Sequence, residues 1–292
     1  AVDPELPAVG GGSVLHGRAG YFASMIPTEA LLAAKLMLVA ASMWGASLLA
    51  RRYGHAVSGA MAGLPVIVGP IMAMLLVDLP AERVRAIALA TLACEPALLV
   101  HIVVFAHAAR RLTWPACSLL ATLAYMLAAT PLARLGWSAA AASAIALAAL
   151  VVAARALPFS GSGAAVPVPR SELAWRIGVA LVIAGSVMWG ADRLPVALAG
   201  ALLAVPITGS VLPCFTLRLH GLEATVRLMS GFVRGQVGFV AFFIALVALL
   251  PLAPKALAFG AAVAAAVSSP LLLGWMERRL LRSGTRGDSG AV

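Results

Sequence analysis

The sequence predicts an all-α polytopic membrane protein, and three observations support this fold class. Of the 292 residues, 62% are hydrophobic and 11% are charged, whereas in a soluble domain about a quarter of the residues are charged. The apolar residues also form blocks long enough to cross a bilayer, which takes roughly 20 residues per helix. Two of these blocks are broken by a proline at the same place. A soluble protein of this length could not bury so many all-round apolar helices.

The apolar blocks predict nine transmembrane helices, separated by turn residues or charges. Arg and Lys near the helix ends test this number, because cytoplasmic connections carry an excess of positive charge. Odd-numbered connections and the tail hold twelve such residues, and even-numbered connections hold five. This bias predicts an outer N-terminus and a cytoplasmic C-terminus in a bacterial inner membrane. The predicted helices span approximately residues 28–50, 57–78, 83–109, 113–133, 136–157, 173–191, 194–216, 223–250 and 254–277.

The composition also limits the partners and cofactors. The net charge of +10 does not indicate nucleic-acid binding, because the basic residues lie at the ends of apolar blocks, where they meet lipid headgroups. The lipid bilayer is the expected partner. The three cysteines, Cys94, Cys117 and Cys214, lie inside apolar blocks without metal-ligand spacing, so no metal is expected. The chain has no Walker A loop, Gly-x-Ser-x-Gly or His-Glu-x-x-His motif, so neither a bound cofactor nor ATP-driven transport is expected.

The predicted organisation is two repeats around a linking helix. Residues 1–24 are rich in Gly and Pro and lack the apolar core of a signal peptide. They are interpreted as expression-derived or upstream sequence before a native start at Met25, or alternatively as a disordered native leader. The remaining predicted segments are repeat 1 at 25–133, a linking helix within 134–158, a cytoplasmic loop at 159–172, repeat 2 at 173–282 and a polar tail at 283–292.

The internal repeat centres on residues 59–69 and 200–210, which are rich in small apolar residues and are broken by Pro65 and Pro206. The offset of 141 residues predicts a 4+1+4 arrangement in which helices 1–4 match helices 6–9. Because the second copy starts five helices after the first, the two halves have inverted topology. Inverted repeats with broken helices in matching positions are typical of secondary transporters, whose site lies near the midplane.

Glu95 is the strongest single candidate for a binding residue. It lies 12 residues after Arg83, hence roughly 18 Å into its helix and near the bilayer centre. A carboxylate at that depth is costly and usually faces the protein interior, paired or protonated. Its counterpart at the repeat offset is Gln236, with Arg234 two residues earlier. Glu95 would take up a coupling proton and Arg234 would hold an anionic group; alternatively the two form a structural ion pair, or Arg234 snorkels to the inner face.

The broken stretches supply the remaining candidates. A proline inside a helix leaves a backbone carbonyl without its usual partner, so Pro65, Gly69, Pro206, Thr208 and Ser210 could present backbone groups to a substrate or ion. The alternative is a kink that only improves helix packing. Lower-ranked candidates are His101, Trp44 and Trp189; the two tryptophans belong to matching Met-Trp-Gly-Ala tetrads at 43–46 and 188–191.

These patterns favour a secondary transporter or exporter of an anionic or amphiphilic small molecule, driven by protons or Na⁺. Two alternatives stay open: an intramembrane lipid-handling enzyme using Glu95, His101 and Arg234, and a structural or accessory subunit without a site. Small-residue faces on the predicted helices at 113–133, 136–157 and 254–277 would suit close packing within the chain or a homo-oligomer.

Overall fold

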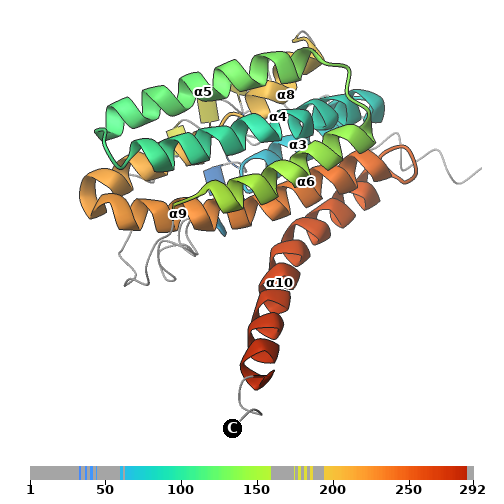
Figure 1. Ribbon diagram of the computed structural model, residues 1–292. Coiled ribbons are helices and arrows are strands. Elements are labelled where there is room, and N and C mark those ends of the chain that lie inside the picture. The colour runs from blue at the N-terminus through green and yellow to red at the C-terminus, as the bar shows by residue number, and fades with distance from the viewer. Residues whose placement is uncertain are drawn as a thin grey trace, which may run out of the picture.

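The described part of the chain is a bundle of helices joined by short turns (Figure 1). The computed structural model describes residues 63–158 and 194–287, with isolated positions within 33–61 and 174–186. Five of the described helices are long and apolar enough to cross a membrane, which supports the predicted class of α-helical membrane protein. The helices are α3 (Val68–Asp78), α4 (Ala81–Ala108), α5 (Trp114–Arg134), α6 (Ala139–Ala156), α8 (Val196–Leu203), α9 (Ile207–Leu249) and α10 (Lys255–Gly287).

The predicted helices at 28–50 and 173–191 lie largely outside the described residues. The few positions described within them are helical. The total of nine helices and the inverted repeat therefore stay predictions.

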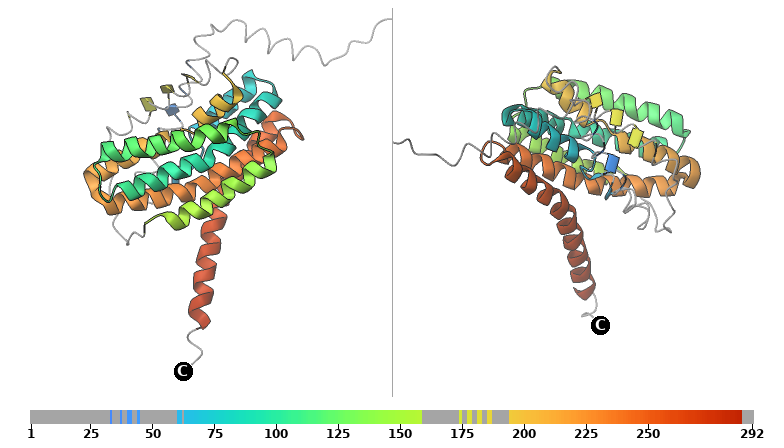
Figure 2. Two further views of the ribbon diagram at one scale, coloured as in Figure 1. Left: turned by 45° about the horizontal axis from the view of Figure 1, so that its top comes forward. Right: turned by 180° about the vertical axis from the view of Figure 1, so that it is seen from behind.

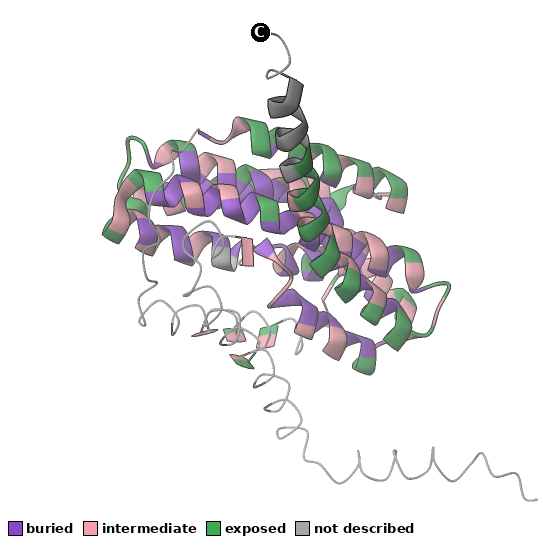
Figure 3. Cartoon of the chain, turned by 90° about the horizontal axis from the view of Figure 1, so that it is seen from below, coloured by how far each residue is buried: buried purple, intermediate pink, exposed green. Residues whose placement is uncertain are grey.

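Helix α4 occupies the centre of the bundle and packs against α3, α5, α6, α8 and α9. Leu, Ala, Val and Ile fill it, and Pro80 immediately precedes its first turn. Most of the apolar stretch of α4 is buried inside the protein. Helices α5 and α6 instead leave most of their apolar residues at least partly exposed, as helices bordered by lipid do. Figure 3 shows the buried residues concentrated in the bundle and the exposed ones along its periphery and α10.

Both predicted helix breaks are present. In the first, helical structure at Gly63 gives way to turns at Leu64–Ile67, and α3 starts at Val68. In the second, α8 ends at Leu203 and α9 starts at Ile207, immediately after Pro206. Pro206 directly precedes α9, and Pro65 lies three residues before α3, so neither proline interrupts the hydrogen bonds of the helix that follows it.

Helix α9 consists of two segments, 207–220 and 222–249, separated by Gly221. Gly221 has φ 76° and ψ −172°, a backbone conformation that strongly favours glycine. The chain reverses direction at this point (Figures 1 and 2). The sequence predicts separate helices ending at 216 and starting at 223; the structure instead continues the first to residue 220 and turns at a single glycine.

Glycines allow close backbone contact between the two halves of the chain. A Cβ added to Gly200 of α8 would lie 2.8 Å from the backbone N of Thr91 on α4. A Cβ added to Gly235 of α9 would lie 2.8 Å from the Cα of Gly63 and would also overlap the Ala60 carbonyl oxygen. Each broken span thus rests against a long helix from the other half of the sequence.

Helix α10 packs against α9 and then runs away from the bundle (Figure 1). Lys255, its first residue, donates hydrogen bonds to the carbonyl oxygens of Leu76 and Leu79 at 2.9 and 2.7 Å. Pro80 cannot supply the N–H that Leu76 would otherwise receive. Lys255 therefore completes the C-terminus of α3 and ties it to the start of α10.

The glycine contacts give a stability prediction. Gly200→Ala and Gly235→Ala should each destabilise the protein by about 1–3 kcal/mol, because the new methyl group meets backbone atoms that cannot move aside. Gly260→Ala is the control, since a Cβ at Gly260 of α10 meets no atom within 4 Å. Alanine should leave that helix unchanged or stabilise it by up to about 1 kcal/mol. Thermal unfolding in detergent compares the three variants; equal effects would contradict close packing at Gly200 and Gly235.

Candidate functional site

Glu95 lies at the midpoint of α4, a helix of 28 residues, which puts it about 20 Å from either end. Its side chain is fully buried, with 0% exposure. Neither carboxyl oxygen has a hydrogen-bond partner among the described residues. A buried carboxyl group without a partner is costly and needs an explanation beyond packing.

The second helix break lies level with Glu95. Helix α8 and the first segment of α9 run parallel to α4, with three contacts along their length. These contacts are Arg83 Nη2 to the Leu194 carbonyl oxygen at 3.2 Å, Gly200 against Ala90 and Thr91, and His101 Nε2 near the Gly209 carbonyl oxygen at 3.4 Å. Interpolation between them puts Ala204 and Val205, the residues just before Pro206, at the level of Glu95.

Gln236 has an equivalent position beside the first break. It lies at the midpoint of the second segment of α9, which spans 222–249. A Cβ added to Gly63 would lie 2.9 Å from the backbone N of Gln236. Gly63, the last helical residue before the first break, therefore packs directly against Gln236. The Gln236 side chain is 2% exposed, and its Oε1 has no hydrogen-bond partner among the described residues.

Glu95 and Gln236 lie at the same level of the bundle. Helix α4 and the second segment of α9 pack together and run in opposite directions (Figures 1 and 2). Arg85, near the start of α4, donates from Nε to the Val247 carbonyl oxygen at 3.0 Å. Arg85 is ten residues from Glu95, and Val247 is eleven from Gln236. Two unsatisfied polar side chains therefore share the midpoint of the bundle with the two breaks.

Arg234 is not part of this buried group. Its side chain is exposed, whereas Gln236 two positions later is buried. Residues two apart on a helix point in nearly opposite directions, so both could not face the interior. The structure contains no ion pair between Glu95 and Arg234, because both Glu95 oxygens lack a partner among the described residues.

His101 and Ser210 meet across α4 and α9. His101 Nε2 lies 3.3 Å from Ser210 Oγ, and that hydroxyl donates to the Pro206 carbonyl oxygen at 2.7 Å. Because the hydroxyl has a single proton, its oxygen accepts from an Nε2–H tautomer of His101. The same nitrogen approaches the Gly209 carbonyl oxygen, which lacks its usual helical donor because residue 213 is proline. His101 and Ser210, which the sequence analysis ranked separately, thus form polar contacts with each other and with the backbone at the start of α9.

Tyr125 of α5 is a site residue that the sequence analysis did not single out. Its hydroxyl donates to the Ala201 carbonyl oxygen at 2.7 Å. In a continuous helix that carbonyl would accept from Val205, but the Val205 N–H bonds to Leu202 instead at 3.2 Å. Tyr125 also lies within electrostatic range of Glu95. A tyrosine in the middle of an apolar helix was the available signal, since a buried hydroxyl needs a partner.

The other predicted residues are more dispersed. Pro65 lies in the turns of the first break, and Gly69 is buried in the first turn of α3 with its N–H bonded to the Pro65 carbonyl oxygen at 2.7 Å. Thr208 lies in the first turn of α9. Trp44 is 55% exposed, and Trp189 lies outside the described residues.

No family model, curated protein or solved structure matches the chain. The candidate site therefore rests on its own geometry.

Removing the Tyr125 hydroxyl should weaken the second break. Tyr125→Phe leaves the Ala201 carbonyl without its side-chain donor, which should cost about 1–3 kcal/mol in the free energy of unfolding. The matched control on the same helix is Thr130→Val, because the exposed Thr130 hydroxyl bonds only to the Met126 carbonyl oxygen one turn earlier. That change should stay within about 0.5 kcal/mol. Thermal unfolding in detergent measures both, and a Tyr125→Phe value equal to the control would contradict this role.

Proposed function

We propose that the protein is a secondary transporter whose site lies at the midplane, between the two broken spans. The observation that carries this proposal is the fully buried carboxyl group of Glu95, which has no hydrogen-bond partner in the described part of the chain and lies level with the break before Pro206. Ionisable groups inside membranes usually belong to ion or substrate pathways. A static subunit would gain nothing from an unsatisfied carboxyl group beside two interrupted helices.

The exchange of contacts between the halves supports an inverted repeat. The first broken span contacts the second segment of α9 at Gly235, and α8 contacts α4 at Thr91. At the repeat offset of 141 residues these two long helices correspond to one another, as do the two broken spans. A twofold relation in the membrane plane would produce this reciprocal packing. The relation would place Glu95 and Gln236 together at the crossing point, where transporters of this kind hold their substrate.

In this mechanism Glu95 takes up and releases the coupling proton. A neutral carboxylic acid is tolerated in an apolar bundle, whereas its ionised form needs water or a positive partner. Exposure of the site to one side of the membrane would therefore promote proton release to that side. Gln236 supplies a carbonyl oxygen for a donor group on the substrate. Backbone groups at the breaks, near Pro65 and Pro206, contribute the remaining polar contacts.

The proposal includes the orientation predicted from charge: inner membrane, N-terminus outside and C-terminus in the cytoplasm. On this orientation the turn at Gly221 faces the cytoplasm. The substrate is proposed to be a small anion or an amphiphile.

The test is a proton-flux assay in liposomes that compares the wild-type protein with Glu95→Gln across small anions and amphiphiles. Substrate-dependent flux should fall to the level of empty liposomes in Glu95→Gln, because the amide cannot release a proton. The control Glu82→Gln changes an exposed carboxylate in the first turn of the same helix and should retain the flux.

A folded Glu95→Gln protein with wild-type flux would refute the role of Glu95. Size-exclusion chromatography and thermal unfolding establish whether the variant is folded. Loss of the fold, rather than of flux alone, would indicate a structural role for the carboxyl group.

A further inference from the structure

One face of the second segment of α9 combines charge with depth in the membrane. Glu223, Arg227, Ser230 and Arg234 follow one another at intervals of four, three and four residues, so they form a single stripe along the helix. Glu223 and Arg234 are exposed, and Arg227 and Ser230 are partly exposed. We call these four residues the polar stripe.

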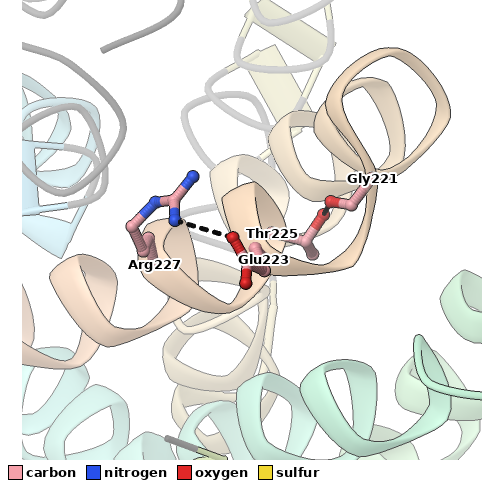
Figure 4. Close-up of polar contacts among 4 residues, drawn as sticks. All are labelled: Gly221, Glu223, Thr225 and Arg227. Carbon is pink, nitrogen blue, oxygen red and sulfur yellow. Dashed lines mark hydrogen bonds and ion pairs between the residues drawn. The ribbon is translucent and has the colours of Figure 1, made fainter. Parts of the chain in front are cut away.

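The stripe starts at the Gly221 turn (Figure 4). Arg227 Nη1 lies 3.4 Å from Glu223 Oε2 in an ion pair, and Thr225 Oγ1 donates to the Gly221 carbonyl oxygen at 2.9 Å on another face of the helix. Arg234, at the other end, lies about 16 Å along the axis from Glu223. It is therefore close to the level of Gln236.

The polar stripe is confined to one face and one half of this helical segment. Around the helix, Val226, Leu228, Met229 and Val233 are buried at 4% exposure or less. Along the helix, the same face continues as Val237, Ala241, Ala245 and Ala248, which are all apolar. The polar stripe thus ends at the level of the candidate site, and the face beyond it has the composition expected next to lipid or apolar protein.

We propose that the polar stripe lines a water-filled vestibule that opens at the Gly221 end, stops near Arg234 and admits anions. A charged side chain about 16 Å inside a membrane-spanning helix needs water or polar protein around it. The stripe carries two guanidinium groups, which bind carboxylate or phosphate oxygens well. The vestibule stands on the stripe itself; its use as a substrate path rests on the transporter proposed above.

Cysteine accessibility tests the vestibule without any transport measurement. Ser230→Cys is introduced after Cys94, Cys117 and Cys214 are replaced by alanine, and membrane-impermeant thiol reagents are applied to right-side-out and inside-out vesicles. Ser230→Cys should react only when the Gly221 side is accessible, which the charge pattern predicts to be the cytoplasmic side. The controls are Leu228→Cys on the buried face and Ala245→Cys further along the same face, and both should be inert.

The charge preference is tested with one anionic and one cationic reagent of similar size. The anionic reagent should label Ser230→Cys faster. Arg234→Gln should lower the ratio of the two rates by about tenfold, because loss of a positive charge about 6 Å away slows the anionic reagent and speeds the cationic one. Labelling of Ser230→Cys from neither side would overturn the vestibule. If Ala245→Cys is labelled as fast as Ser230→Cys, the vestibule does not stop near Arg234. If the rate ratio is unchanged in Arg234→Gln, the vestibule does not prefer anions.

These outcomes are independent of the flux assay. Labelling as expected, together with normal flux in Glu95→Gln, would retain the vestibule and reject the coupling role of Glu95. If the cysteine-free protein does not fold, the same comparison is made in the native background after subtraction of its own labelling.

Discussion

Backbone hydrogen bonding in apolar surroundings is the constraint on which this structure depends. Water is absent from a bilayer core, so every carbonyl that a proline leaves without a donor must find one elsewhere in the protein. Lys255 serves the Leu76 carbonyl ahead of Pro80, and His101 approaches the Gly209 carbonyl ahead of Pro213. Tyr125 serves the Ala201 carbonyl at the second break. Side chains distant in sequence thus fix the interrupted helices in place, and this fixation also orders the candidate site.

Against this background the carboxyl group of Glu95 is an exception. Tyr125 and His101 serve freed carbonyls on the neighbouring span, yet the Glu95 oxygens have no partner among the described residues. Gln236 shares the exception through its Oε1. A bundle that supplies donors at the second break but leaves these two groups without a partner among the described residues is consistent with groups reserved for something that arrives during function.

Much of this arrangement could be predicted from the residues. Length and hydropathy placed the long helices, since a membrane-spanning helix leaves a strong signal, and Pro65 and Pro206 marked both breaks. The depth of Glu95 followed from the helical rise alone. The partners across helices could not be predicted in the same way: nothing local to Tyr125 indicates that it bonds to Ala201. The opposite exposure of Arg234 and Gln236 could have been deduced from their spacing of two, because a helix turns such residues apart. The single-residue turn at Gly221 was not predicted in detail, since a glycine alone does not specify a reversal.

The reciprocal glycine contacts have a consequence for how the protein is made. Thr91 of α4 is synthesised 109 residues before Gly200 of α8, which rests on its backbone. During that interval α4 can cross the membrane as an independent helix, because its backbone hydrogen bonds are internal, but α8 does not yet cover its backbone at Thr91. Synthesis of the second half must complete the first. The order of translation therefore leaves this side of the bundle centre without α8 until a late step of assembly, and insertion factors or lipid would have to cover it before then.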